Sequence, residues 1–171
     1  MNDNITSQQE RIPAKAMGPE EQSDAIVVSF GAEWHKQLTA KQFSVVIRKR
    51  VPKSTSFKWL YFHVNSPIGA ICARAAIKTI FTATAKEAVK LAGKINLTPE
   101  EITEYIGNDA SIGCYEIARF QFAKASLTTA VLGTRLTYYA PQSFFILSKP
   151  AKLRIDQMAV FSSSVQSKLK K

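Results

Sequence analysis

The stretch FSVVIRKRVPKSTSFKWLYFHV, residues 43–64, shapes the interpretation of the whole chain. It begins as an alternating apolar segment, runs into Arg48, Lys49 and Arg50, and after Pro52 and a polar loop reaches an aromatic segment. Two such segments joined by a turn-rich loop are typical of strands in one sheet. Because side chains alternate between the faces of a strand, the three cations cannot all lie on one side. They either meet a negatively charged partner or form a solubilising rim.

The pattern of apolar runs and turn residues predicts an α+β fold. The expected strands are residues 24–30, 43–50, 58–65, 70–83, 111–122 and 140–147. Helices are expected at residues 31–41, 84–95 and 98–107, where Thr84 and Thr98 suit the capping positions and Glu101 follows three residues after its cap. Residues 127–136 fit neither pattern. Short strands with helices set aside favour a small mixed β-barrel over a parallel βαβ sheet.

The chain length of 171 residues suits one domain with two tails. Residues 1–23 are polar and predict a disordered arm, residues 24–149 form the expected domain, and residues 150–171 predict a basic C-terminal helix or tail. In that last segment Met158, Phe161, Val165 and Leu169 recur at spacings of three or four. This spacing indicates a weakly amphipathic helix that packs on the domain.

Several classes of protein are disfavoured by composition. No apolar run reaches the roughly 18 residues that a membrane span needs, and the polar N-terminus is unlike a secretory signal. Cys72 and Cys114 are far apart and belong to no Cys/His cluster, which is typical of free thiols in a reducing cytosol. We therefore expect a cytoplasmic protein with no membrane association, metal or cofactor.

Positive charge is the strongest global feature of the sequence. The net charge is +10, and the segment from Trp34 to Lys86 contains 10 Lys or Arg residues and no Asp or Glu. Such a field attracts polyanions, of which nucleic acid is the commonest in a cytosol. A basic protein without a specific partner is the alternative.

A resemblance to the ASCH domain family, which belongs to the PUA-like superfamily, extends over roughly residues 25–147. In that family a strand ends in serine, a short helix with an acidic and an aromatic residue follows, and a later strand carries an arginine. Without any gap, Ser29, Glu33, Trp34 and Arg48 match these positions. Near the end, the closing Pro-Gln-Ser-Phe of the family resembles Pro141, Gln142, Ser143 and Phe144. The resemblance implies a PUA-like barrel and, by analogy, RNA binding.

The chain departs from the family at the positions that carry its chemistry. Members that hydrolyse modified cytidines or RNA use a lysine together with a hydroxyl or carboxyl group, but the family's lysine falls on Phe43 and its glutamate on Val46. Neither side chain can transfer a proton. Lys41 and Ser44 lie close by, and a lysine can activate a serine in principle. They are weak catalytic candidates; a turn lysine and an ordinary strand hydroxyl are the alternative.

The basic half offers a candidate nucleic-acid surface. Cations hold phosphates and aromatic faces stack bases, which single-stranded or looped RNA exposes. The candidate contact residues are Lys41, Arg48, Lys49, Arg50, Lys53, Lys58, Trp59, Tyr61, Gln142 and Ser143. Trp59 and Tyr61 share one face of their strand, and one face of that strand must be core. Arg48 shares the face of Val46 and is expected to be the anchored cation, whereas Lys49 points the other way.

We interpret the sequence as a PUA-like RNA-binding module without catalysis. The first alternative is a nucleic-acid-directed hydrolase, either a ribonuclease or an acetylcytidine amidohydrolase, that uses Lys41 and Ser44. The second is a protein-interaction module in transcription. The sequence leaves the RNA target and the oligomeric state open.

Overall fold

The computed structural model describes residues 21–40, 42–136, 138 and 140–162. Within them the strands are β1 (Gln22–Phe30), β2 (Val45–Arg48), β3 (Trp59–Val64), β4 (Ala70–Thr84), β5 (Ser111–Thr128), β6 (Phe144–Ser148) and β7 (Phe161–Ser162). The helices are the 3-10 helix η1 (Ala32–Trp34) and α1 (His35–Ala40), α2 (Ala85–Lys90), α3 (Ala92–Ile95), α4 (Pro99–Ile106), α5 (Thr129–Leu136) and α6 (Lys149–Ala159). Each predicted strand and helix is present, with shifted ends. None of the helices in the described residues is long and apolar enough to cross a membrane.

The strands form one curved mixed sheet in the order β2-β5-β4-β3-β1-β6, and β7 pairs with β5. β1 runs parallel to β3, with Ile26 opposite Leu60, and the other pairs are antiparallel. The expectation of a closed barrel was wrong, because the pairing recorded among the described residues leaves β2 and β6 as the two ends of the strand order. β2 has only four residues, all of them paired with β5.

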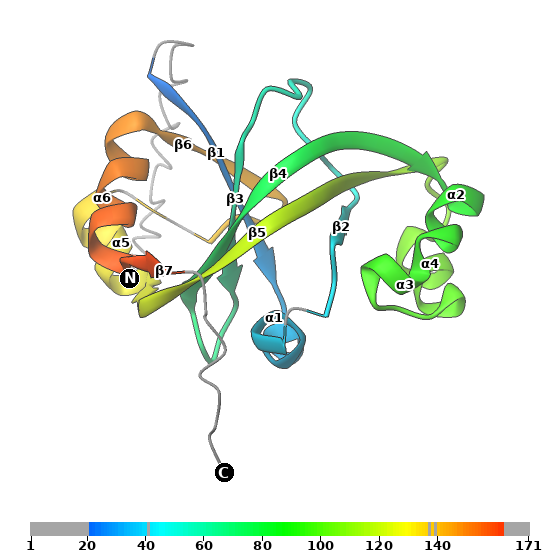
Figure 1. The fold of residues 1–171 in the computed structure, drawn as a ribbon, viewed down its shortest axis with the longest axis horizontal. Helices are drawn as coiled ribbons and strands as arrows, with labels where there is room; N and C mark the ends of the chain where they lie inside the picture. The colour runs from blue at the N-terminus through cyan, green and yellow to red at the C-terminus, as the bar shows by residue number, and fades with distance from the viewer. Residues whose placement is uncertain (1–20, 41, 137, 139, 163–171) are drawn as a thin grey trace, which may run out of the picture.

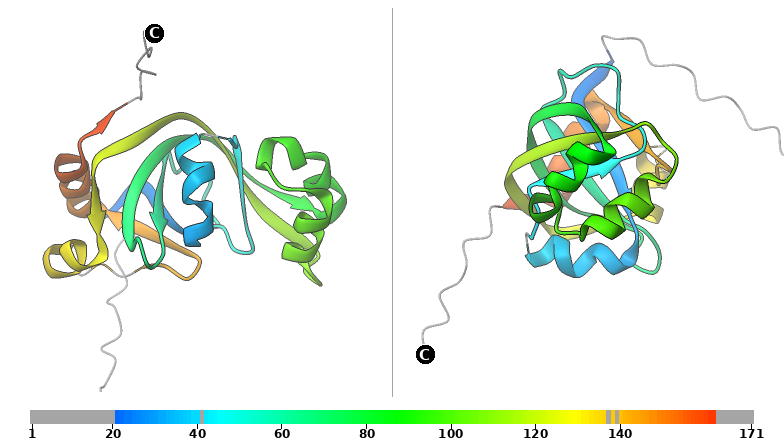
Figure 2. Two further views of the ribbon diagram at one scale, coloured as in Figure 1. Left: turned by 90° about the horizontal axis from the view of Figure 1, so that it is seen from below. Right: turned by 90° about the vertical axis from the view of Figure 1, so that its right-hand side faces the viewer.

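The longest strands, β4 and β5, extend beyond the body of the sheet and carry a helical unit made of α2, α3 and α4 at their far end (Figures 1 and 2). The chain turns into this unit at Thr84 and Thr98, which each form a capping box with a glutamate three residues later. These caps satisfy backbone N–H groups that the first helical turn leaves unpaired. The two predicted caps are therefore confirmed.

Three buried clusters hold the molecule together. The first fills the inside of the curved sheet with residues such as Phe30, Leu60 and Phe62. The second lies on the opposite face of the sheet, under α5 and α6, and the third packs α2–α4 against β2 and the far part of β4 and β5. Figure 2 shows α5 and α6 at one end of the molecule and α2–α4 at the other.

The C-terminal helix differs from its prediction. α6 ends at Ala159, Val160 adopts a left-handed conformation, and Phe161 lies in β7. The buried face of α6 consists of Ala151, Ile155 and Ala159, whereas the predicted Met158 and Phe161 are only partly buried against the same cluster. Small alanine side chains let this helix approach the sheet closely, a feature that a search for large apolar residues does not detect. Val165 and Leu169 lie outside the described residues.

The described residues begin close to the predicted start of the domain. β1 begins at Gln22, two residues before the expected start of the domain, and residues 1–20 of the predicted arm lie outside the described residues. Residues 129–136 of the ambiguous segment form α5, whose Leu132 is buried against the sheet.

Candidate functional site

A cavity of about 330 Å³ lies beside β2, where the edge of the sheet meets the helical unit. That volume falls within the usual range for small-molecule sites. It is lined by residues of β1, η1, β2 and the segment before β6, and by three residues of the helical unit. The lining residues are Ser29, Phe30, Gly31, Glu33, Trp34, Phe43, Val45, Val46, Ile47, Arg48, Ile95, Leu97, Tyr105 and Gln142.

Arg48 spans the gap that strand pairing leaves open. Its Nη1 donates to the Ile47 carbonyl at 2.8 Å, and its Nη2 donates to the Ser29 carbonyl at 2.6 Å. The guanidinium also lies 4.0 Å from the centroid of the Phe30 ring. Because Ser29 belongs to β1, this one side chain links β2 to the strand that lies next to β6, the other end of the strand order. A lysine could not make this pair of bonds together with the stacking contact.

The charge of Arg48 has no counter-anion in the described residues, since no carboxylate there lies within ion-pair distance of its nitrogens. Desolvation by burial lowers the pKa of Arg48 from its ordinary value, and electrostatic interactions with Tyr105 and Tyr115 partly offset this effect. A partly buried cation without a counter-anion, at the wall of a cavity, is suited to a ligand that brings acceptor atoms.

A second donor in need of an acceptor is buried near Arg48. Tyr115 on β5 lies directly opposite Val46 in the register, is 0% exposed, and its hydroxyl has no hydrogen-bond partner among the described residues. Burial raises the pKa of this phenol, so it remains protonated at neutral pH. An unpaired buried hydroxyl costs about 1–3 kcal/mol, and Tyr115 itself belongs to the inner cluster and is absent from the cavity lining.

Two residues of the cavity lining are apolar at the positions that the sequence analysis matched to the lysine and glutamate of ASCH domains. Phe43 is 8% exposed and packs against Phe30, Phe62 and Phe120. Val46 is also buried and lines the same cavity. The sequence-based matching therefore placed both residues correctly in the cavity, and both present only hydrocarbon to it.

Glu33 is the one carboxylate among the described residues that line the cavity. It is exposed and makes no ion pair with another described residue. Its side chain folds back over the backbone of Gly31, so that a Cβ atom at Gly31 would collide with the carboxylate. The missing side chain of Gly31 thus makes room for the observed position of the Glu33 oxygens.

The structure describes only one member of the weak catalytic pair. Lys41 lies outside the described residues, so its position is unassigned. Ser44 is exposed and is absent from the cavity lining, while its backbone N–H donates to the Lys94 carbonyl at 2.8 Å. Ser44 therefore acts here as a backbone link between the β2 segment and α3.

The remaining cations of the opening stretch fall into two groups. Lys49 pairs with Asp109 at 3.3 Å and lies 5.9 Å from the centroid of the Tyr105 ring. Arg50, Lys53 and Lys58 are exposed and form no ion pair within the described residues. The free positive charge near the end of β2 thus comes from Arg50 and the loop that follows it.

The two aromatic candidates on β3 are already occupied by contacts within the protein. Tyr61 is 0% exposed and its hydroxyl donates to Asp156, so its assignment as a stacking surface was wrong for this fold. Trp59 is partly buried, with the Arg74 guanidinium 4.4 Å and the Arg119 guanidinium 5.8 Å from a ring centroid. Both faces of β3 are covered, one by the inner cluster and the other by α5 and α6.

The last two predicted contact residues lie on the segment before β6. Gln142 is exposed and lines the cavity, whereas Ser143 is half-buried and is absent from its lining.

His63 on β3 is a buried histidine. It is 1% exposed, with its ring nitrogens 3.4 Å from Ser29 Oγ and 3.0 Å from Thr129 Oγ1. Its contacts are those of a core histidine rather than those of a base in a cavity.

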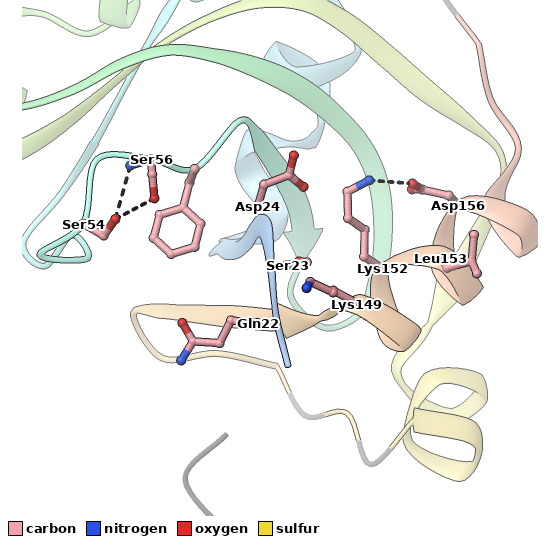
Figure 3. Close-up of a pocket in the computed structure, with 10 residues that line it drawn as sticks. Gln22, Ser23, Asp24, Ser54, Ser56, Lys149, Lys152, Leu153 and Asp156 are labelled. Atoms are coloured by element: carbon pink, nitrogen blue, oxygen red, sulfur yellow. Dashed lines mark hydrogen bonds and ion pairs between the residues drawn. The ribbon is translucent and has the colours of Figure 1, made fainter. Parts of the chain in front are cut away.

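A larger hollow of about 600 Å³ lies elsewhere, between the start of β1, the loop before β3 and α6 (Figure 3). Its charged walls are Lys149 and Lys152 together with Asp24 and Asp156. Figure 3 shows Lys152 turned towards Asp156, and the two are 3.2 Å apart. Because positive and negative groups balance there, this hollow is a poorer anion site than the cavity beside β2.

Sequence reasoning did not find the helical wall of the cavity. Ile95, Leu97 and Tyr105 come from the α3–α4 region, far along the chain from β2. Their apolar spacing indicates only an amphipathic helix, and nothing local shows that the long β4–β5 pair folds this unit back onto β2.

Solved structures support an ASCH-like fold for this chain. The crystal structure of ASCH from Zymomonas mobilis matches with a TM-score of 0.71 and 17% sequence identity, over 82% of this chain and 97% of that chain. Two substituted forms of the same Zymomonas mobilis protein each match with a TM-score of 0.69 and 16% identity, over 84% and 82% of this chain and 99% and 100% of those chains. No protein-family model and no curated protein sequence matches this chain. The resemblance stated from the sequence is confirmed at the level of the fold.

Proposed function

We propose that this protein binds single-stranded or looped RNA and that the cavity beside β2 receives an unpaired base. The observation that carries the proposal is the composition of the cavity, where Trp34, Phe43 and Tyr105 supply aromatic surface and Arg48 supplies a cation that has no counter-anion among the described residues. Flat aromatic walls with a few hydrogen-bonding groups suit a nucleobase. An unpaired base can leave the RNA chain to enter such a cavity, whereas a base in a duplex cannot.

The backbone of the RNA would be held outside the cavity. Arg50, Lys53 and Lys58 are exposed on the segment that follows β2, and Arg50 is only two residues from Arg48. Phosphate contacts of this kind contribute affinity without sequence preference. The likeness to other ASCH-fold structures supports the fold on which the proposal rests and leaves the ligand to be tested.

Binding is favoured over catalysis by the apolar character of Phe43 and Val46 in the cavity wall. A general base needs a titratable group within hydrogen-bond reach of the reacting atom. The general base would have to be Glu33, because it is the one carboxylate among the described residues that line the cavity, and no histidine is among them. Glu33 is exposed. This arrangement supports a protein that binds nucleobases more than it supports a hydrolase.

The test is fluorescence anisotropy with a labelled 15-nucleotide single-stranded RNA over a series of salt concentrations. If five phosphates are contacted, log K should fall against log salt with a slope of about −3.5. Arg48→Lys should weaken binding although it keeps the charge, because lysine cannot bridge the two carbonyls. Lys86→Arg, on the first turn of α2, is the matched control and should bind like the original protein. A slope near zero, or no binding at low salt, would refute the proposal.

A further inference from the structure

One cation and one carboxylate line the described part of the cavity, Arg48 on β2 and Glu33 on η1. Arg48 keeps N–H groups beyond the two that it gives to backbone carbonyls, so it can still donate to a ligand. The charged acceptor is the Glu33 carboxylate, which is exposed and lies over Gly31.

A ligand that fits this arrangement needs acceptor atoms at one edge and donor groups at an adjoining edge. Guanine has O6 and N7 as acceptors on one edge, and beside them the N1–H and 2-amino groups as donors. A carboxylate has two oxygens and can accept both donors together. Adenine and cytosine each offer one exocyclic amino group, and uracil offers one ring N–H, so none of them presents two neighbouring donor groups to a carboxylate.

We propose that the cavity selects guanine, with Glu33 accepting from the N1–H and 2-amino groups and Arg48 donating to the acceptor edge. This inference rests on the proposed binding of an unpaired base and names the base. Glu33 is then the specificity-determining residue. Gly31 is a positioning residue, because any larger residue there displaces the Glu33 carboxylate. The guanine can belong to an RNA strand or to a free nucleotide, since both present the same edges.

The experiment uses the full chain and labelled ten-nucleotide oligouridylates whose central position is U, A, C, G or inosine. The G oligonucleotide should bind about tenfold more tightly than the U, A and C ones, which corresponds to one good bidentate contact. Inosine lacks only the 2-amino group of guanine, so it should lose most of that advantage. Competition by GMP, but not by UMP, against the G oligonucleotide supports the same assignment for the free nucleotide.

Variants separate recognition from general binding. Glu33→Gln and Gly31→Ala should each bring the G oligonucleotide to within about twofold of the U oligonucleotide. Glu100→Gln, which removes an exposed carboxylate from α4 outside the cavity, should keep the tenfold preference. Circular dichroism and thermal unfolding check that each variant is folded. Glu33 and Glu100 are exposed, and Gly31 has no side chain to remove.

The outcomes distinguish this inference from the function on which it rests. Equal, salt-dependent binding of all five oligonucleotides would overturn the guanine assignment and leave RNA binding standing. A preference for another base, or a G preference that survives Glu33→Gln, would also overturn it. No binding of any oligonucleotide at low salt, with no effect of GMP, would refute both proposals.

Discussion

Replacing Asp156 should destabilise the protein by detaching α6 from the sheet. The Asp156 carboxylate accepts from the buried Tyr61 hydroxyl, and its Oδ1 lies 2.9 Å from Arg74 Nη1. Arg74 itself is held by a 2.7 Å bond from Nε to Gln121 and packs 4.6 Å from the centroid of the Phe161 ring. Asp156 therefore joins three parts of the second buried cluster through one carboxylate.

The size of the effect follows from these contacts. Removing one partner of a buried ion pair costs about 3–5 kcal/mol. The side chains of Arg74 and Asp156 keep 16% and 24% exposure, so solvent screening reduces this loss to about 2 kcal/mol. The buried Tyr61 hydroxyl loses its acceptor at a further cost of about 1 kcal/mol. Asp156→Ala should thus lower the free energy of unfolding by about 3 kcal/mol.

Urea unfolding followed by circular dichroism measures this loss, and a double-mutant cycle with Tyr61→Phe measures the coupling. A coupling of at least about 0.5 kcal/mol is expected for two residues that share a hydrogen bond. Lys152→Ala is the control, because Lys152 and Asp156 form an i,i+4 helix pair worth only about 0.5 kcal/mol. If Asp156→Ala costs no more than Lys152→Ala, the network does not hold α6 and the reasoning is refuted.

Three further predictions concern other parts of the molecule. A Cβ atom at Gly113 would collide with the Val51 side chain, so Gly113→Ala should cost about 1–3 kcal/mol in urea unfolding, and an unchanged midpoint would contradict this. Burial lowers the pKa of His63, so the unfolded chain binds its proton at higher pH than the folded protein does. Unfolding midpoints should therefore fall as the pH drops below about 6.5, and this part of the pH dependence should be absent in His63→Gln. The protein should release no acetate from acetylated cytidine, and turnover that disappears in Ser44→Ala would promote the hydrolase alternative.

Local signals in the sequence were sufficient for the parts of the fold that local physics decides. Thr84 and Thr98 were identified as caps because a threonine followed three residues later by glutamate satisfies N–H groups within one turn. Strand side chains alternate, and the structure accordingly places Val46 in the inner cluster but Val45 and Ile47 in the cluster with the helical unit. These inferences need no knowledge of distant segments.

Features that depend on distant segments were not predictable in the same way. Closure of a barrel depends on pairing between the ends of the strand order, and the four residues of β2 contain no signal that the pairing stops there. Alternation could show that Tyr61 shares a face with Trp59, but not that α5 and α6 cover that face. The burial of Ala151 and Ala159 likewise depends on the close approach of α6, which only the folded structure determines.

Ultraviolet crosslinking of the purified protein to an unmodified single-stranded RNA, followed by mass spectrometry of the crosslinked peptides, tests the central claim most directly. The account predicts crosslinks at Trp34 and Tyr105, the partly exposed aromatic residues at the cavity, and their loss at high salt concentration. Crosslinks confined to peptides of α5 and α6, or no crosslinked RNA at low salt, would contradict the assignment of the cavity beside β2 as an RNA site.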